Sequence, residues 1–115
     1  MLRRSSPSVR VFYPRLDREA VVRALREGIE RLDAALPIRR VVLFGSYAKG
    51  THTVASDIDV LVVYDGEPQS SAYAVTKRTL GIPRLEPHLY TTAEYEAAAA
   101  TVERMTREGV VILSR

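Results

Sequence analysis

Two short runs, 38–44 and 58–64, constrain the fold most, because both are mostly apolar and rich in Val and Ile. β-Branched side chains of this kind pack well on a pleated sheet and are restricted in a helix. A short apolar run bounded by turn residues is typical of a buried strand. Between the two runs, residues 46–53 are small and polar and indicate a loop with a short helical turn. A sheet is therefore expected at the centre of the fold.

Residues 17–36 precede these strands and have the period of an amphipathic helix. Asp17 is a good N-cap, and Pro37 follows the last turn, where it ends a helix. Gly28 lies inside the helix and indicates close packing against a neighbouring element. The apolar positions, spaced by three and four, are Leu16, Ala20, Ala24, Leu25, Ile29, Leu32 and Leu36.

The segment after the second strand predicts two more helices and two more strands. Residues 69–80 suit a helix, and 92–108 suit one long helix with an apolar stripe. Residues 85–91 form a third strand, which we expect either at a sheet edge or locally bulged, because Pro87 has no N–H to donate to a neighbour. Residues 110–113 form a short last strand.

This order of elements predicts an α/β (α+β) fold, with a small mixed β-sheet of about four strands and helices packed against it. The chain has 115 residues, and we expect one domain over 1–115 with a core at about 15–113. Residues 1–10 are expected to be a flexible tail. The short apolar stretch 9–13 is either an edge strand or a packed extension.

The composition excludes several classes of protein. The sequence contains no Cys, so a disulfide framework and a Cys-based metal site are both excluded. No apolar run approaches the roughly 20 residues of a membrane span, and the start does not resemble a secretory signal. We therefore expect a cytoplasmic protein without membrane association.

The net charge of +3 is unevenly distributed along the chain. The first forty residues carry ten Arg and five acids, whereas the rest of the chain has an excess of acids. This distribution indicates either a surface that attracts phosphates or an acidic partner, or simply a solvated, Arg-rich helix face.

Asp57 and Asp59 are two residues apart at the start of the second strand. Side chains alternate along a strand, so both carboxylates are expected on one face and Ile58 on the other. Two like charges repel unless a cation lies between them, and Mg²⁺ is commonly held by one or two carboxylates plus substrate phosphates. Two such ions can clamp the attacking and leaving oxygens of a phosphoryl transfer. The alternative is a solvent-facing strand start that happens to be acidic.

Gly45 and Ser46 follow the first strand directly. Glycine allows the backbone to approach a phosphate closely, and the Ser46 hydroxyl and the N–H groups of a following helical turn can bind phosphate oxygens. Lys49 either adds a positive charge to the same site or is a solvated surface lysine. We predict Gly45, Ser46 and Lys49 as nucleotide-binding residues, against the alternative of a plain strand-to-helix turn.

The pattern Gly-Ser-x-Ala-x-Gly over 45–50, followed by Ser-Asp-Ile-Asp over 56–59, resembles the minimal nucleotidyltransferases of the DNA polymerase β-like superfamily. The resemblance implies the polymerase β-like nucleotidyltransferase fold. It also implies that the Gly-Ser loop holds the phosphates of a nucleotide, while Asp57 and Asp59 bind metal ions. The reaction implied is transfer of a nucleoside monophosphate from a nucleoside triphosphate to a hydroxyl, with release of pyrophosphate.

The family has a third carboxylate on its third core strand, and Glu86 takes that place here. The resemblance implies that Glu86 helps hold the catalytic metal and acts as the base. The chain departs from the family by having Glu instead of the usual Asp, followed by Pro87; the alternative is an exposed edge-strand acid. Asp57, Asp59 and Glu86 are thus predicted as catalytic and metal-binding residues with two Mg²⁺ ions. His88 shares the strand face of Glu86, but we favour a satisfied or surface histidine.

By the same resemblance, the chain is the antitoxin that transfers AMP from ATP to a tyrosine of a HEPN-type helical toxin. Nothing in the chain is left to hold a tRNA or primer, so nucleic acid is not expected as a partner, whereas an oligomer is compatible with the apolar stripe on 92–108. Tyrosines, Tyr73 among them, are expected to pack. Two alternatives stay open: a catalytically weakened module that binds nucleotide or toxin and acts sterically, and a transferase for a small molecule, which usually needs a second domain.

Overall fold

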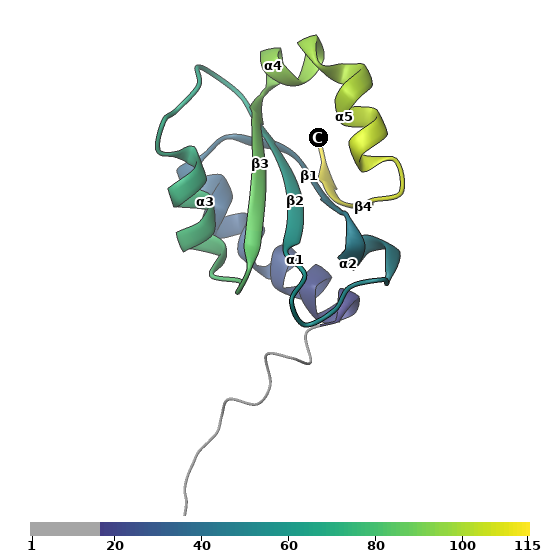
Figure 1. Ribbon diagram of the computed structural model, residues 1–115. Helices are drawn as coiled ribbons and strands as arrows, with labels where there is room; N and C mark the ends of the chain where they lie inside the picture. The colour runs from purple at the N-terminus through teal and green to yellow at the C-terminus, as the bar shows by residue number, and fades with distance from the viewer. Residues whose placement is uncertain (1–16) are drawn as a thin grey trace, which may run out of the picture.

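The computed structural model describes residues 17–115 (Figure 1). The predicted tail 1–10 and the stretch 9–13 lie outside the described residues. The helices are α1 (Arg18–Ala35), α2 (Ser46–Lys49), α3 (Ala72–Leu80), α4 (Thr92–Ala97) and α5 (Ala99–Thr106). The strands are β1 (Ile38–Phe44), β2 (Ile58–Tyr64), β3 (Leu85–Thr91) and β4 (Val110–Ser114). Within this part of the chain, no helix combines the length and apolar character needed to cross a membrane.

The strands form one mixed sheet in the order β3-β2-β1-β4. β1 is antiparallel to both of its neighbours, whereas β2 and β3 are parallel and connected by α3. β3 lies at an edge, one of the two alternatives predicted from Pro87. The predicted fold class, a mixed four-stranded sheet with helices packed against it, is confirmed.

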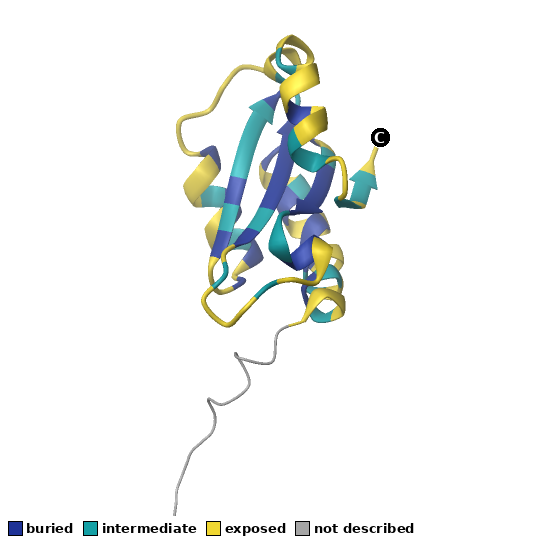
Figure 2. Ribbon diagram, turned by 45° about the vertical axis from the view of Figure 1, so that its right-hand side comes forward, coloured by how far each residue is buried: buried dark blue, intermediate teal, exposed yellow. Residues whose placement is uncertain are grey.

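α1 and α3 cover one face of the sheet, and the larger part of the core lies beneath them (Figure 2). Asp17 caps α1 by accepting a hydrogen bond of 2.8 Å from the Ala20 N–H, which confirms the predicted start. The close packing predicted at Gly28 is also present, because a Cβ there would lie 2.5 Å from Leu80 Cδ2. The core residues on this face include Val21, Leu25, Leu32, Leu36, Val41, Leu43, Ile58, Val60, Val62 and Leu85.

α4 and α5 cover only part of the opposite face (Figure 1). They pack on a smaller apolar cluster, which consists of Val42, Phe44, Leu61, Val63 and Val102 with Tyr90, Tyr95, Ala98 and Met105 around it. The first residues of β2 and β3 on this face, Asp59 and Glu86, remain half-buried. The sheet therefore has one fully covered face and one partly open face.

The prediction of one continuous helix over 92–108 was wrong, because the helix breaks at Ala98, where φ is −110° and ψ is 23°. Ala98 itself packs on the apolar cluster of the sheet. The break turns α5 back along the sheet, so that Tyr95 of α4 and Val102 of α5 both contact it. A straight helix would carry its second half away from the sheet. The predicted start of this segment is confirmed by a capping box between Thr91 and Glu94.

Candidate active site

Asp57 and Asp59 lie at the open face, where β2 begins. The Asp57 side chain is 60% exposed and the Asp59 side chain 29% exposed. Asp59 is the second residue of β2, and its Cα is paired with that of Phe44 on β1. The alternation of side chains puts Asp59 on the face of Leu61 and Val63, opposite to buried Ile58. The carboxylate is thus held on a rigid strand between β1 and β3.

Gly45 lies against Asp59 for two separate reasons. Its φ is +80°, a conformation that residues with a side chain rarely adopt. In addition, a Cβ at this position would lie only 2.5 Å from Asp59 Oδ2. Glycine at 45 therefore lets the end of β1 and the Asp59 carboxylate approach each other, and the turn into α2 begins at the carboxylate.

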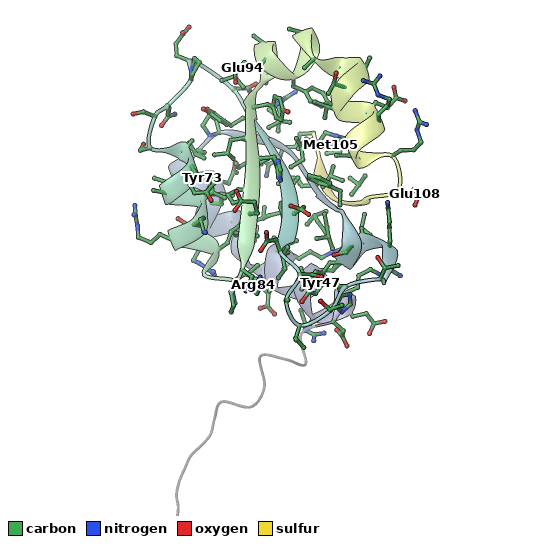
Figure 3. The ribbon with its side chains drawn as sticks, viewed as in Figure 1. Tyr47, Tyr73, Arg84, Glu94, Met105 and Glu108 are labelled. Atoms are coloured by element: carbon green, nitrogen blue, oxygen red, sulfur yellow. The ribbon has the colours of Figure 1, made fainter. Side chains whose placement is uncertain are left out.

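Glu86 lies beside Asp59, because the two residues are Cα partners in the parallel pairing of β2 and β3. Neighbouring strands are about 4.8 Å apart, so the two side chains share one face at adjacent positions. The Glu86 carboxylate accepts hydrogen bonds from the Tyr73 hydroxyl, with distances of 3.0 Å to Oε1 and 3.2 Å to Oε2. Figure 3 shows Tyr73 on α3, beside the edge strand β3. Tyr73 is 43% exposed, and its hydroxyl contacts the acid rather than the core.

His88 also contacts Asp59, one of the acids of the candidate site. Its Nε2 lies 3.2 Å from Asp59 Oδ1, and its ring packs edge-on against Phe44 with centroids 4.9 Å apart. The sequence favoured a satisfied or surface histidine. The structure shows a satisfied one, whose partner is a carboxylate of the candidate site.

Arg84 holds the loop before β2 in place through hydrogen bonds to its backbone. Its guanidinium donates to the carbonyl oxygens of Ser56, at 3.1 Å, and of Ala55, and it lies 3.4 Å from Asp57 Oδ1. Arg84 has a positive φ of 62°, which is uncommon for a residue with a side chain. This strained residue contacts both the backbone of the loop and the Asp57 carboxylate. No local pattern in the sequence indicated it.

Ser46 and Lys49 are the first and last residues of α2. Ser46 follows Gly45 directly and is half-buried, whereas Lys49 is exposed. The role of Ser46 and Lys49 in phosphate binding stays a prediction.

Each of the three predicted metal ligands has a protein partner: Arg84 for Asp57, His88 for Asp59 and Tyr73 for Glu86. Within residues 17–115, no three His, Cys, Asp or Glu side chains are grouped so that they could hold one metal ion. The donors are nevertheless all carboxylate oxygens, which Mg²⁺ prefers, and Mg²⁺ usually takes only one or two of them together with phosphates and water. The donor atoms are therefore of the chemical kind that Mg²⁺ prefers, and a metal role for these three residues stays a prediction.

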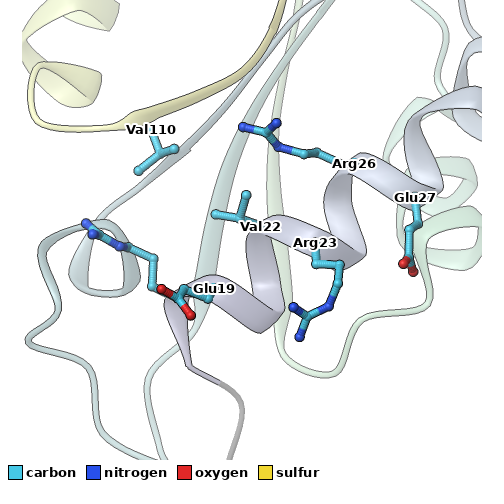
Figure 4. A pocket seen from close by; sticks show the side chains of 7 residues that line it. Glu19, Val22, Arg23, Arg26, Glu27 and Val110 are labelled. Atoms are coloured by element: carbon cyan, nitrogen blue, oxygen red, sulfur yellow. The ribbon is translucent and has the colours of Figure 1, made fainter.

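A hollow of about 550 Å³ lies elsewhere, between α1 and β4 (Figure 4). The residues around it are Arg18, Glu19, Val22, Arg23, Arg26, Glu27 and Val110, so none of the predicted site residues line it. Most of this lining is charged and belongs to the basic first part of the chain. Asp59 and Glu86 instead lie on the partly open face of the sheet, where both remain half-buried.

The sequence is similar to a known protein family and, over a short segment, to a curated relative. Residues 22–110 match the family described as "Nucleotidyltransferase domain", a range that includes Gly45, Asp57, Asp59 and Glu86. A 28-residue segment is 57% identical to a "putative protein adenylyltransferase" of Methanocaldococcus jannaschii. That segment is 24% of this chain and spans 28% of the relative's length.

Solved structures with a similar backbone include a "putative nucleotidyltransferase" from Sulfolobus solfataricus, with a TM-score of 0.57 and 19% identity over 85% of this chain and 84% of that chain. A toxin–antitoxin structure with AMP-PNP is similar with a TM-score of 0.56 and 19% identity, over 78% of this chain and 73% of that chain. At this identity the likeness shows a shared fold.

Proposed function

The chain belongs to the nucleotidyltransferase domain family, and on that basis we propose that it transfers AMP from ATP to a hydroxyl acceptor and releases pyrophosphate. The observation that carries the proposal is a row of three residues across adjacent strands: Gly45 after β1, Asp59 on β2 and Glu86 on β3. The row offers, in order, a phosphate-binding turn, a metal-binding acid and an acid for proton transfer.

The triphosphate binds at the turn into α2. Gly45 brings this turn directly against the Asp59 carboxylate, because a Cβ at position 45 would lie 2.5 Å from Asp59 Oδ2. The Ser46 hydroxyl and the free N–H groups of the first turn donate to phosphate oxygens, and Lys49 adds a positive charge. These groups orient the α-phosphate toward β2.

Asp57 and Asp59 would hold Mg²⁺, with Glu86 as the third ligand. Two bound ions would neutralise charge on the phosphates and on the attacking oxygen. Arg84 and His88 orient Asp57 and Asp59 through the contacts described above, so these carboxylates are fixed before the nucleotide arrives. Glu86 accepts the proton of the acceptor hydroxyl as that oxygen attacks the α-phosphorus.

We further propose that the acceptor is a tyrosine of a HEPN-type helical toxin and that this chain is its antitoxin. The support is a shared fold with a toxin–antitoxin structure containing AMP-PNP, and a short, highly identical segment in a relative named as a protein adenylyltransferase. The half-exposed position of Asp57 and Glu86 agrees with an acceptor that approaches as a protein surface rather than as a small molecule in a deep pocket.

One observation favours a second function, a module that binds the toxin or a nucleotide without transfer. In the described part of the chain the acids do not form a group of three, and Glu86 is already hydrogen-bonded by Tyr73. A chain of this kind would neutralise its partner sterically.

The test mixes the purified chain with Mg²⁺, ATP radiolabelled at its α-phosphate and a HEPN-type toxin. We expect label on the toxin, and a loss of about a thousandfold or more in Asp57→Asn, because a metal site contributes several kcal/mol to transition-state stabilisation. The matched control is Glu67→Gln, an exposed acid in the turn after β2, which should label normally. Labelling that survives Asp57→Asn would exclude the mechanism. Calorimetric binding of Mg-ATP without any transfer would favour the steric module.

A further inference from the structure

Tyr73 places a phenol hydroxyl directly on the acid that the proposed reaction uses as its base. The hydroxyl lies 3.0 Å from Glu86 Oε1, which is within reach for proton transfer. Tyr73 is 43% exposed, and it stands in the first turn of α3 at the open edge of the sheet. A tyrosine that only packed would be buried, and this one is accessible to a ligand.

The position of this hydroxyl relative to the rest of the row is informative. Gly45, which follows β1, lies against Asp59 of β2. Asp59 is in turn paired with Glu86 on the edge strand β3. Glu86 accepts a hydrogen bond from Tyr73 on α3. The proposed phosphate site is thus at one end, the metal-binding acids are in the middle and a hydroxyl is at the other end. A group transfer needs its donor, its charge-stabilising groups and its acceptor in this order.

We propose that Tyr73 is a site of self-modification, to which the chain transfers a nucleoside monophosphate in cis; the inference rests on the proposed function. Tyr73 Oη attacks the α-phosphorus of the nucleoside triphosphate, and a new P–O bond forms. The bond between the α-phosphorus and the oxygen that bridges to the β-phosphorus breaks, and pyrophosphate leaves. The phenol proton passes to the Glu86 carboxylate. The product is a nucleoside monophosphate joined to the tyrosine oxygen.

Two further observations support an acceptor role. Lys77, one turn along α3, has its Nζ 5.5 Å from the centroid of the Tyr73 ring, and this cation–π contact holds the exposed ring in place. Because Tyr73 belongs to the same rigid domain as Asp59 and Glu86, it is present at a high effective concentration without any binding step. A partner hydroxyl must displace Tyr73 from Glu86 before it can react. The nucleotide on Tyr73 would therefore block that position.

The experiment incubates the purified chain alone with Mg-ATP and maps adducts by intact-mass and peptide mass spectrometry. We expect one AMP adduct, on the peptide that contains Tyr73, and no adduct in Tyr73→Phe or Asp59→Asn. The control Tyr95→Phe removes a hydroxyl from a half-buried ring on α4 and should leave the adduct in place. An adduct on another residue, or one that persists in Tyr73→Phe, would overturn the proposal.

Two additional arms separate this inference from the proposed function. With the HEPN-type toxin present, label on the toxin but never on the chain overturns self-modification and leaves the proposed function standing. Absence of label from both proteins overturns both. The rate constant of self-modification should not change with the concentration of the chain, because the transfer occurs in cis. A rate constant that rises with concentration would instead show transfer between copies and overturn the cis step.

Discussion

The two faces of the sheet are built from the same strands but serve different purposes. On the face covered by α1 and α3, nearly every side chain is apolar and fully buried. On the opposite face, apolar residues occur where α4 and α5 lie, and acids occupy the open starts of β2 and β3. On β2, buried Val60 follows half-buried Asp59 directly. One face therefore supplies the stability that lets the other face hold like charges close together.

The largest expected effect comes from a cavity in the covered face. Leu25 of α1 is fully buried, and Leu25→Ala should lower the free energy of unfolding by about 2–5 kcal/mol, through lost burial and a residual cavity. Chemical denaturation measures this loss, and AMP transfer per folded molecule should stay unchanged. The exposed neighbour Arg26 is the control, since Arg26→Ala should change stability by less than about 0.5 kcal/mol. A large loss of transfer in folded Leu25→Ala would mean that the two faces are not separable.

Gly45→Ala is the intermediate case, because it changes a residue of the open face that is also structurally constrained. The positive φ should reduce stability by about 1–2 kcal/mol, and the new Cβ would push the Asp59 carboxylate away. We expect nucleotide transfer to fall together with thermal stability. The comparison is Gly66→Ala, which also has a positive φ but open space around its Cβ position, and which should lose stability only. Normal transfer in Gly45→Ala would show that Asp59 does not need its present position.

The smallest effect is electrostatic and lies at the end of α1. A hydrogen bond from the Arg115 guanidinium, and a second one from the Ile38 N–H, hold the pKa of Asp33 below its usual value. A lowered pKa in the folded state stabilises the protein above the unfolded pKa of about 3.9, and this contribution is lost as the pH falls through the folded value. Thermal melts of wild type and Asp33→Asn should therefore differ slightly at neutral pH and converge below about pH 4. A gap that widens on acidification would contradict this assignment.

The fold was predictable where local chemistry decides the structure. β-Branched runs gave β1 and β2, Pro87 placed β3 at an edge, and Asp17 set the start of α1. The break at Ala98 was not predictable, because alanine has the highest helix propensity and nothing in the run 97–100 favours an interruption. Packing on the sheet decides it, and packing is not visible in a local pattern.

The candidate site, like the fold, has one part that was predictable from the sequence and one part that was not. The spacing of Asp57 and Asp59 and the turn at Gly45 lie within one short segment, so their proximity could be read from the sequence. The contacts of Tyr73, Arg84 and His88 connect residues that are far apart in the chain. Their positions depend on where α3 and the loop before β3 lie, and no spacing rule gives that information.

The parallel register of β2 and β3 also determines which insertions and deletions the protein can tolerate. Asp59 and Glu86 meet because the two strands are aligned residue by residue, whatever the length of the loop 65–71 between β2 and α3. That loop can gain or lose residues without separating the two acids. The deletion of one residue at the start of β3, by contrast, would turn Glu86 and His88 toward the covered face and bring apolar neighbours to the open one. Evolutionary variation in length should therefore collect in the loop and be absent from the strand.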